Sequence, residues 1–246
     1  DDIERLLSKR LFSYYYLRKS MMERVRKSKE ISKLFLDSGA FSALTKGITI
    51  DLDEYIGFIK ETQDLWTTYA ALDVIGNYQK TNENIIYMES KGLSPLPTFH
   101  YKSPISELEK MIKKYHYIAL GGLVPLARRR KVLESWLDFC FKFLMPEIKY
   151  RKLRVHGFGL NSLWAWYKYP FYSVDATSWN QAAQFGIMKE FVGLKWITHE
   201  KTDLITAGKW HSNQDWKPRT KKNIENYQEA EKLVTNLWSE RGIIYD

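Results

Sequence analysis

The sequence of 246 residues contains a single cysteine, Cys140, which excludes a disulfide within the chain and a zinc site built from several cysteines. No run of about 18 apolar residues is present, which excludes a membrane-spanning helix. The segment Asp1–Arg5 is not a basic stretch followed by an apolar one, so we expect no secretory signal here. A reducing, cytoplasmic setting is therefore the expected localisation.

The sequence also lacks the motifs that hold nucleotides and metals. No Gly-rich loop ends in Lys-Ser or Lys-Thr, the arrangement that binds the phosphates of nucleoside triphosphates. No His-Glu-x-x-His or comparable ligand pair is present, so we expect neither a metal nor a cofactor. Without a low-complexity linker or an internal repeat, residues 1–246 are predicted to form a single domain that ends in a helix over residues 222–241.

Positive charge and aromatic side chains are both abundant. Lys and Arg number 38 against 29 Asp and Glu, which gives a net charge of +9, and aromatics make up 15% of the chain. Cationic side chains neutralise phosphates and flat rings stack on unpaired bases, so this composition favours a nucleic-acid partner. The same composition also suits solubility and core packing, so alone it identifies no partner.

Short apolar runs alternate with helical patterns along most of the chain. The runs that predict strands are Phe12–Leu17, Leu34–Asp37, Tyr69–Asp73, Leu96–His100, Tyr117–Leu120, Leu153–His156, Tyr172–Asp175 and Phe191–Ile197. The helices are expected at Asp51–Thr62, Thr81–Ser90, Ser106–Tyr115, Arg128–Leu144 and Lys222–Arg241. This alternation predicts an α/β fold with a parallel sheet, and eight strands favour a (β/α)8 TIM-type barrel, regular or irregular, over an open doubly wound sheet.

Acidic residues stand at the ends of several predicted strands, where a barrel carries its chemistry. Asp37 and Asp175 are the expected catalytic pair. Two carboxylates can support retaining glycosyl transfer, in which one attacks the anomeric carbon and the other moves the proton. Either aspartate could instead cap the N-terminus of a helix.

Five short segments resemble, in chain order, motifs of the tRNA-guanine transglycosylase family. They are Leu36-Asp37-Ser38-Gly39-Ala40-Phe41, Ala71-Leu72-Asp73, Ala119-Leu120-Gly121-Gly122-Leu123, His156-Gly157-Phe158-Gly159 and Phe171-Tyr172-Ser173-Val174-Asp175. The resemblance covers roughly residues 34–180. It implies that Asp37 is the general acid and base and that Asp175 is the nucleophile. It further implies that Asp73 reads the edge of guanine.

The resemblance also implies further contacts with the substrate. The base would stack on Phe41 and receive hydrogen bonds from backbone amides of the Gly121-Gly122-Leu123 turn. The remaining expected substrate contacts are Ser38, His100, His156 and Gly157. The basic run Arg128-Arg129-Arg130-Lys131 is the expected nucleic-acid contact, with a solvated helix start as the alternative. Trp164, Trp166 and Trp179 are read as packing residues, with base stacking as the alternative.

Several departures from the family pattern bear on the substrate. Ala40 replaces a glycine and His156 a methionine, and the single cysteine implies that the zinc subdomain of the tRNA enzymes is absent. The short chain looks more like the DNA-directed branch found in phages and bacterial genomic islands. That branch exchanges guanine in DNA for a 7-deazaguanine such as 7-cyano-7-deazaguanine. The expected partners are DNA and the free deazaguanine base; a tRNA-directed enzyme and an inactive nucleic-acid-binding homologue remain alternatives.

Overall fold

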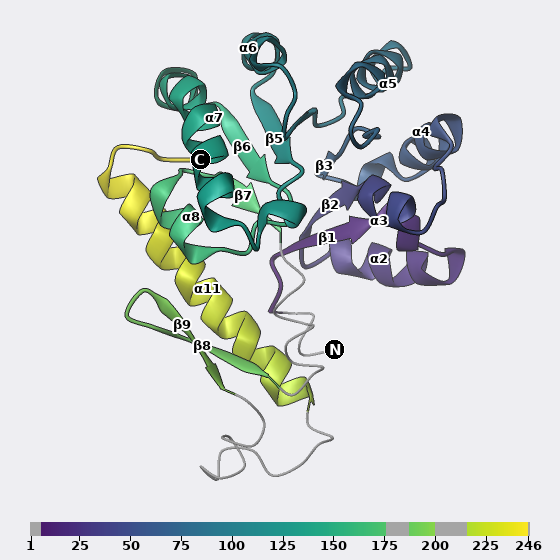
Figure 1. The fold of residues 1–246 in the computed structure, drawn as a ribbon. Helices are drawn as coiled ribbons and strands as arrows, with labels where there is room; N and C mark the ends of the chain where they lie inside the picture. The colour runs from purple at the N-terminus through teal and green to yellow at the C-terminus, as the bar shows by residue number, and fades with distance from the viewer. Residues whose placement is uncertain (1–5, 176–186, 200–215, 246) are drawn as a thin grey trace. The chain divides into compact units, whose positions relative to one another are not determined.

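The computed structural model describes residues 6–175, 187–199 and 216–245 (Figure 1). These residues form a mixed α/β fold with parallel strand pairs. The chain divides into two compact units. The sheet unit comprises Leu7–Leu123 and Leu153–His156. The helical unit comprises Val124–Lys152 and the described residues from Gly157 onward, together with Leu6.

The strands of the sheet unit lie side by side in the order in which the chain makes them. They are β1 (Lys9–Ser13), β2 (Lys33–Asp37), β3 (Thr68–Tyr69), β4 (Thr98–His100), β5 (Tyr117–Gly121) and β6 (Arg154–Gly157, in this unit as far as His156). β1 pairs with β2, β2 with β3 and β4 with β5, all in parallel. A parallel bridge between Ala70 and Leu96 joins the two halves of this row. Strands that run in parallel end at a common edge, so side chains just beyond them can meet there.

Helices connect these strands and bury an apolar face against them. They are α2 (Met22–Lys29), α3 (Ala40–Thr45), α4 (Leu52–Glu61), α5 (Tyr78–Ser90) and α6 (Ile105–Lys114), with short 3-10 turns η1 (Tyr14–Tyr16), η2 (Lys19–Met21) and η3 (Gln63–Leu65). Figure 1 shows α4, α5 and α6 along one side of the strands. The Asp51 carboxylate accepts a hydrogen bond from the Glu54 amide and so fixes the start of α4. Leu34 and Leu36 of β2 are fully enclosed in one cluster with Tyr55 and Ile59 of α4.

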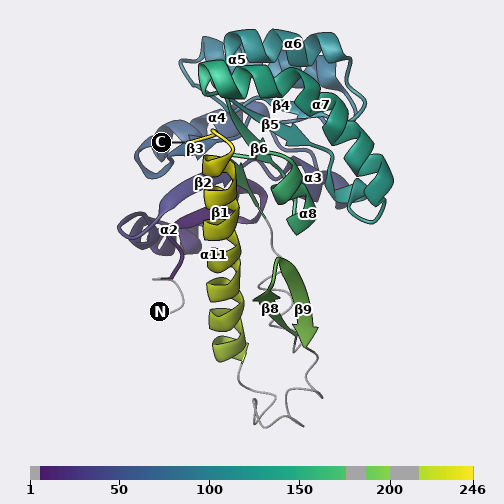
Figure 2. The same cartoon turned by 90° about the vertical axis from the view of Figure 1, so that its left-hand side faces the viewer.

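Two long helices and a hairpin dominate the helical unit. Its elements are η4 (Val124–Leu126), α7 (Arg130–Arg151), α8 (Leu163–Lys168), β7 (Ser173–Val174), β8 (Met188–Val192), β9 (Lys195–His199) and α11 (Trp216–Glu240). The hairpin of β8 and β9 lies along α11 (Figure 2). Asn223 and Asn226 of α11 accept hydrogen bonds from the amides of Lys189 and Phe191 at 2.8 and 3.0 Å. Two side-chain amides therefore satisfy the open edge of β8.

Two strand predictions are wrong. The run Phe12–Leu17 is a strand only as far as Ser13, and the 3-10 turn of Tyr14–Tyr16 follows it. The run Phe191–Ile197 is not one parallel strand but an antiparallel hairpin, because Gly193 and Leu194 adopt positive φ angles of 53° and 70° and reverse the chain.

The strand pairs of the described residues do not form a closed ring. The closed barrel therefore stays a prediction. The C-terminal helix begins earlier than predicted, at Trp216, and the helix predicted from Arg128 starts at Arg130 and continues to Arg151. In the part of the chain that the structure describes, no helix is both long enough and apolar enough to cross a membrane.

Candidate functional site

Four of the predicted site residues stand at one edge of the sheet unit. Asp37, His100 and Gly121 are the last residues of β2, β4 and β5. Asp73 follows β3, and residues 70–72 lie between the strand and this aspartate. The parallel row places all of these at the carboxyl ends of its strands, where open and closed α/β sheets bind their ligands.

The Asp37 carboxylate is held by the turn that follows it. Its Oδ2 accepts a hydrogen bond from the amide of Gly39 at 3.1 Å. Gly39 is the N-cap of α3 and has a φ of 77°, and a Cβ at this position would lie 2.5 Å from Ser13 Oγ and from Tyr15 Cβ. Only glycine fits this turn without strain. Asp37 therefore shapes the approach to α3 but is not its N-cap, and the buried Ser38 lies between the two.

Tyr55 of α4 is a buried neighbour of the candidate site that the sequence analysis did not single out. Its side chain is fully enclosed and its hydroxyl donates to the Ala70 carbonyl at 2.8 Å. Burial raises the pKa of Tyr55 well above its ordinary value, and the negative charges of Asp37 and Asp73 raise it further. Both carboxylates thus lie within electrostatic reach of one phenol, so the structure brings Asp37 and Asp73 into the same region.

Asp73 and His100 form a buried ion pair. Asp73 Oδ2 lies 3.2 Å from His100 Nε2, and the two side chains are only 10% and 11% exposed. The two atoms are at ion-pair distance without the alignment of a good hydrogen bond. Burial lowers the pKa of His100, but its interactions with the Asp73 carboxylate raise it and prevail, so the pKa of His100 stands above its ordinary value.

The second oxygen of Asp73 is the unusual feature of this pair. Asp73 Oδ1 is buried and accepts no hydrogen bond from any residue that the structure describes. Buried polar atoms almost always have a partner, and leaving one without costs about 1–3 kcal/mol. Asp73 Oδ1 is therefore a buried acceptor that the described residues leave unused.

Two glycines at the end of β5, its last residue Gly121 and the following Gly122, shape the turn beside this pair. A Cβ at Gly121 would lie 2.9 Å from both Cε1 and Nδ1 of His100 and 2.7 Å from Thr98 Cγ2. Gly122 has a φ of 74° and lies against the backbone of Tyr101, whose amide donates to the Gly121 carbonyl at 3.2 Å. Neither position tolerates a larger residue without movement. The side chain of the next residue, Leu123, is buried, so a ligand contact there has to involve its backbone.

The aromatic residues predicted to enclose the base differ in exposure. Phe41 on α3 is 43% exposed, so its ring is open to a stacking partner. His156 is 2% exposed and its ring centroid lies 5.0 Å from that of Phe35. This is the environment of a core histidine, and a contact of His156 with the base stays a prediction.

Asp175, the predicted nucleophile, is held by the glycine-rich turn after β6. Its Oδ1 accepts a hydrogen bond from the amide of Gly159 at 2.7 Å, and its own amide lies 3.4 Å from the Gly157 carbonyl. Asp175 is therefore positioned at the end of β7 by backbone groups and not as the cap of a described helix. Asp37 belongs to the sheet unit and Asp175 to the helical unit, so their approach to a common sugar stays a prediction.

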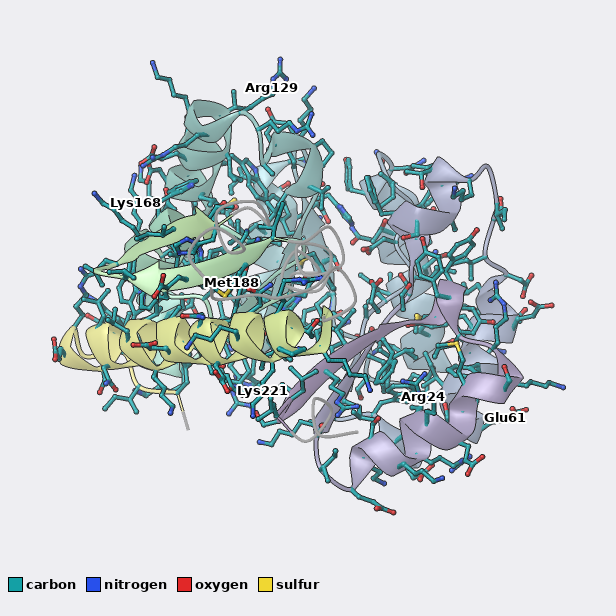
Figure 3. All side chains as sticks on the ribbon, turned by 90° about the horizontal axis from the view of Figure 1, so that it is seen from below. Arg24, Glu61, Arg129, Lys168, Met188 and Lys221 are labelled. Atoms are coloured by element: carbon teal, nitrogen blue, oxygen red, sulfur yellow. The ribbon has the colours of Figure 1, made fainter. Side chains whose placement is uncertain are left out.

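The basic run at the start of α7 lies on the surface of the helical unit. Arg128, Arg129, Arg130 and Lys131 are all exposed, and Figure 3 shows Arg129 projecting away from the ribbon. The Arg130 guanidinium lies 5.0 Å from the ring centroid of Trp164. Trp166 is buried and donates to the Leu160 carbonyl at 3.1 Å, as a packing residue does. Trp179 lies outside the described residues.

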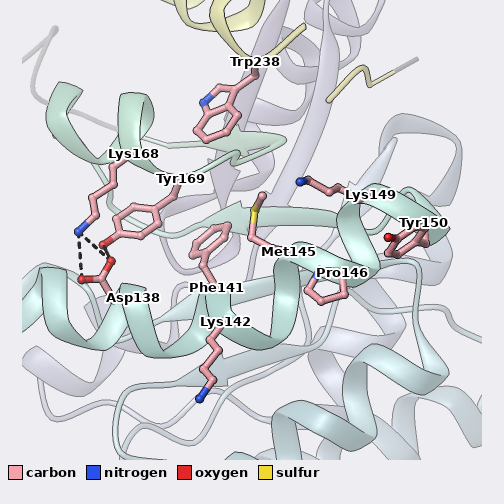
Figure 4. A pocket seen from close by; sticks show the side chains of 10 residues that line it. All are labelled: Asp138, Phe141, Lys142, Met145, Pro146, Lys149, Tyr150, Lys168, Tyr169 and Trp238. Atoms are coloured by element: carbon pink, nitrogen blue, oxygen red, sulfur yellow. Dashed lines mark hydrogen bonds and ion pairs between the residues drawn. The ribbon is translucent and has the colours of Figure 1, made fainter. Parts of the chain in front are cut away.

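A second group of charged side chains lines a hollow of about 550 Å³ in the helical unit (Figure 4). We call Lys168, Asp138, Glu134 and Tyr169 the Lys168 cluster. Lys168 Nζ lies 2.8 Å from Asp138 Oδ1 and 2.9 Å from Glu134 Oε1, and the Tyr169 hydroxyl donates to Asp138 at 2.8 Å. The hydrogen bonds to Asp138 and Glu134 raise the pKa of Lys168. None of the predicted site residues lines this hollow.

Among residues 6–175, 187–199 and 216–245, no three His, Cys, Asp or Glu side chains are grouped so that they could hold a metal ion. The described site is thus built from carboxylates, one imidazole and glycine-rich backbone at the strand ends. Comparison of the sequence with protein-family profiles and with curated proteins finds no match.

Proposed function

We propose that this chain is a DNA-guanine transglycosylase that exchanges guanine in DNA for a 7-deazaguanine, and that its strands close into a (β/α)8 barrel. The observation that carries the proposal is the buried Asp73 Oδ1, which lacks a donor among the described residues. Guanine presents N1–H and an exocyclic amine side by side, and among the common bases only guanine offers this pair of donors there. The order of the motifs that resemble the tRNA-guanine transglycosylases supports the same assignment.

The first part of the reaction is recognition of an extruded base. A guanine leaves its stack at a cost of a few kcal/mol and enters the site. Asp73 accepts hydrogen bonds from its donor edge, and the amides of Gly122 and Leu123 donate to O6. The exposed ring of Phe41 stacks on one face of the base.

Two displacements at the sugar then exchange the base. An oxygen of Asp175 attacks C1′ and forms an ester as the bond to N9 breaks, and Asp37 gives its proton to the departing guanine. The deazaguanine then loses its N9 proton to Asp37, and N9 attacks C1′ and displaces Asp175. Two inversions retain the configuration at C1′. A carbon at position 7 leaves the recognised edge unchanged, so one site accepts both bases.

The choice of DNA rests on the cysteine count, because a single cysteine cannot build the zinc subdomain of the tRNA enzymes. The exposed cations at Arg128–Lys131 suit either nucleic acid, because they would contact phosphates. A direct labelling experiment therefore has to distinguish DNA from tRNA.

The deciding experiment incubates the protein with labelled guanine and either DNA or tRNA and measures the label that enters each polymer. We expect label in DNA, and loss of about 10⁴-fold in rate for Asp175→Asn, which lacks the nucleophile. Asp138→Asn, in the Lys168 cluster, is the matched control and should exchange at the wild-type rate. Label in tRNA alone would establish the alternative, and label in neither would contradict base exchange.

A further inference from the structure

The immediate surroundings of His100 suggest a role that packing does not explain. Its Nε2 lies 3.2 Å from Asp73 Oδ2, at ion-pair distance. A methyl group at residue 121 would meet Cε1 and Nδ1 at 2.9 Å, so the imidazole packs closely on the backbone of Gly121. His100 is thus placed between this backbone and one carboxylate oxygen.

This orientation divides the two oxygens of Asp73 between two tasks. Oδ2 lies beside the imidazole, and Oδ1 is buried without a donor among the described residues. Burial favours the neutral form of any carboxyl group, and a neutral carboxylic acid is a poor acceptor for the donor edge of a purine. When the imidazole of His100 is protonated, its positive charge lies 3.2 Å from Asp73 Oδ2, and a positive charge at this distance favours the charged form of a carboxyl group.

We propose that His100 is a positioning residue that holds Asp73 as an anion, with Oδ2 beside the imidazole and Oδ1 left to accept hydrogen bonds from the donor edge of the base. The inference rests on the proposed function, since it assigns Asp73 to the base. The proposal predicts that the protein still binds guanine in weakly acidic solution, because the positive charge of the imidazolium stabilises the negative charge of the Asp73 carboxylate. Without the imidazolium, recognition should fail at a higher pH.

The charged neighbours support this assignment. Asp73, after β3, is the residue whose interactions raise the pKa of His100, while burial opposes the rise. Thr98 of β4 and Gly121 of β5, which pack beside the ring, are uncharged. Tyr55 of α4 lies within electrostatic reach of Asp73 and of Asp37 at the end of β2, and its raised pKa keeps the phenol neutral.

A first experiment measures the ionisation of His100 directly in the free protein. The imidazole signals are followed by NMR from pH 5 to 9, with His100 assigned by its loss in His100→Gln. We expect the pKa of His100 to stand above its ordinary value and to fall in Asp73→Asn. Glu190→Gln is the matched control, because it removes a carboxylate that lies 2.7 Å from a different histidine, His199, and should leave the signals of His100 unchanged. A pKa of His100 that does not respond to Asp73→Asn would overturn the proposal.

A second experiment measures binding of labelled guanine at pH 5.5 and pH 8. We expect the affinity of the wild type to change by less than about twofold between the two pH values. The affinity of His100→Gln, whatever its value at pH 8, should fall by about tenfold on going to pH 5.5. Equal pH profiles of the two proteins, with guanine bound by both, would overturn the role of His100 and leave the proposed function standing. Absence of guanine binding by the wild type at either pH would contradict the proposed function itself.

Discussion

The Asp73–His100 pair and the Lys168 cluster are both built from charged side chains, but they differ in burial and in completeness. The Lys168 cluster lies at the surface, and Lys168 reaches two carboxylates while Tyr169 donates to one of them. The Asp73–His100 pair is almost enclosed, yet one carboxylate oxygen has no donor among the described residues. The Lys168 cluster is thus joined by several hydrogen bonds, whereas the Asp73–His100 pair leaves one buried acceptor unused, and we propose that a ligand uses it.

The largest effect is expected for the alkylation rate of Cys140. This thiol is buried in the helical unit, so it provides a comparison with the buried Asp73–His100 pair of the sheet unit. Burial raises the pKa of the Cys140 thiol to about 12. At pH 8 the thiolate is then scarce, and alkylation of the native protein should be about 10³-fold slower than that of a free cysteine. Labelling with a thiol reagent, followed by mass spectrometry, measures this rate, and unfolded protein is the control. Fast labelling of the folded protein would show that burial does not suppress the reactivity of the Cys140 thiol.

Replacing one carboxylate from each network tests the difference between them directly. Asp73→Asn removes the charge that accepts the donor edge of guanine, so guanine binding should weaken by about 10²-fold or more. Asp138→Asn removes an exposed partner of Lys168 and should change guanine binding by less than about twofold. Equilibrium binding of labelled guanine measures both. Equal losses in the two variants would mean that the open oxygen of Asp73 has no special role.

A pair of glycine substitutions tests whether His100 depends on the space at Gly121. Gly121→Ala places a methyl group 2.9 Å from the imidazole, so the free energy of unfolding should fall by about 1–3 kcal/mol. Gly57→Ala, inside α4 and with open space around the new methyl group, should raise it by about 0.5–1 kcal/mol. Urea unfolding followed by circular dichroism measures both changes. A neutral Gly121→Ala would show that the ring moves freely.

The smallest effect concerns pH. The pKa of His100 is raised in the folded protein. The interaction of His100 with Asp73 therefore stabilises the folded state fully at a pH below the pKa of an unfolded histidine, about 6.5. This stabilisation is lost as the pH rises through the pKa of His100 in the folded protein. The difference in unfolding free energy between wild type and His100→Gln should therefore shrink from pH 6 to pH 9. The corresponding difference for Lys168→Met should stay constant, because the pKa of Lys168 is raised from a value that already exceeds this range. Urea titrations at several pH values decide, and a parallel decline for Lys168→Met would contradict the expected difference.

Much of the sheet unit could be predicted from sequence because its strands are short apolar runs between helical patterns. The ends of β2, β4 and β6 fall at or within one residue of the predicted ones, and this places Asp37 and His100 correctly at strand ends. The hairpin of β8 and β9 escaped prediction because Leu194, a residue that seldom adopts a positive φ, forms half of its turn.

The partners of the site residues could not be predicted, because they are set by tertiary contacts. Nothing in the sequence shows that Asp73 turns to His100, since 27 positions separate them and the pairing depends on the order of β3 and β4. Tyr55 lies on the buried face of α4, and from the sequence a tyrosine whose hydroxyl reaches the Ala70 carbonyl looks like any packing residue. The one sequence feature that could have pointed to Tyr55 is the presence of a polar hydroxyl on an otherwise aliphatic helix face.

The sequential order of the strands bears on synthesis by the ribosome. Each strand from β2 to β5 lies next to one that the ribosome has already produced, so no nascent strand waits for a distant partner. At a translation rate of about 5–20 residues per second, the wait between neighbouring strands is a matter of seconds. The half of the protein that carries Asp37, Asp73 and His100 can therefore assemble from its N-terminus while the remainder is still being translated.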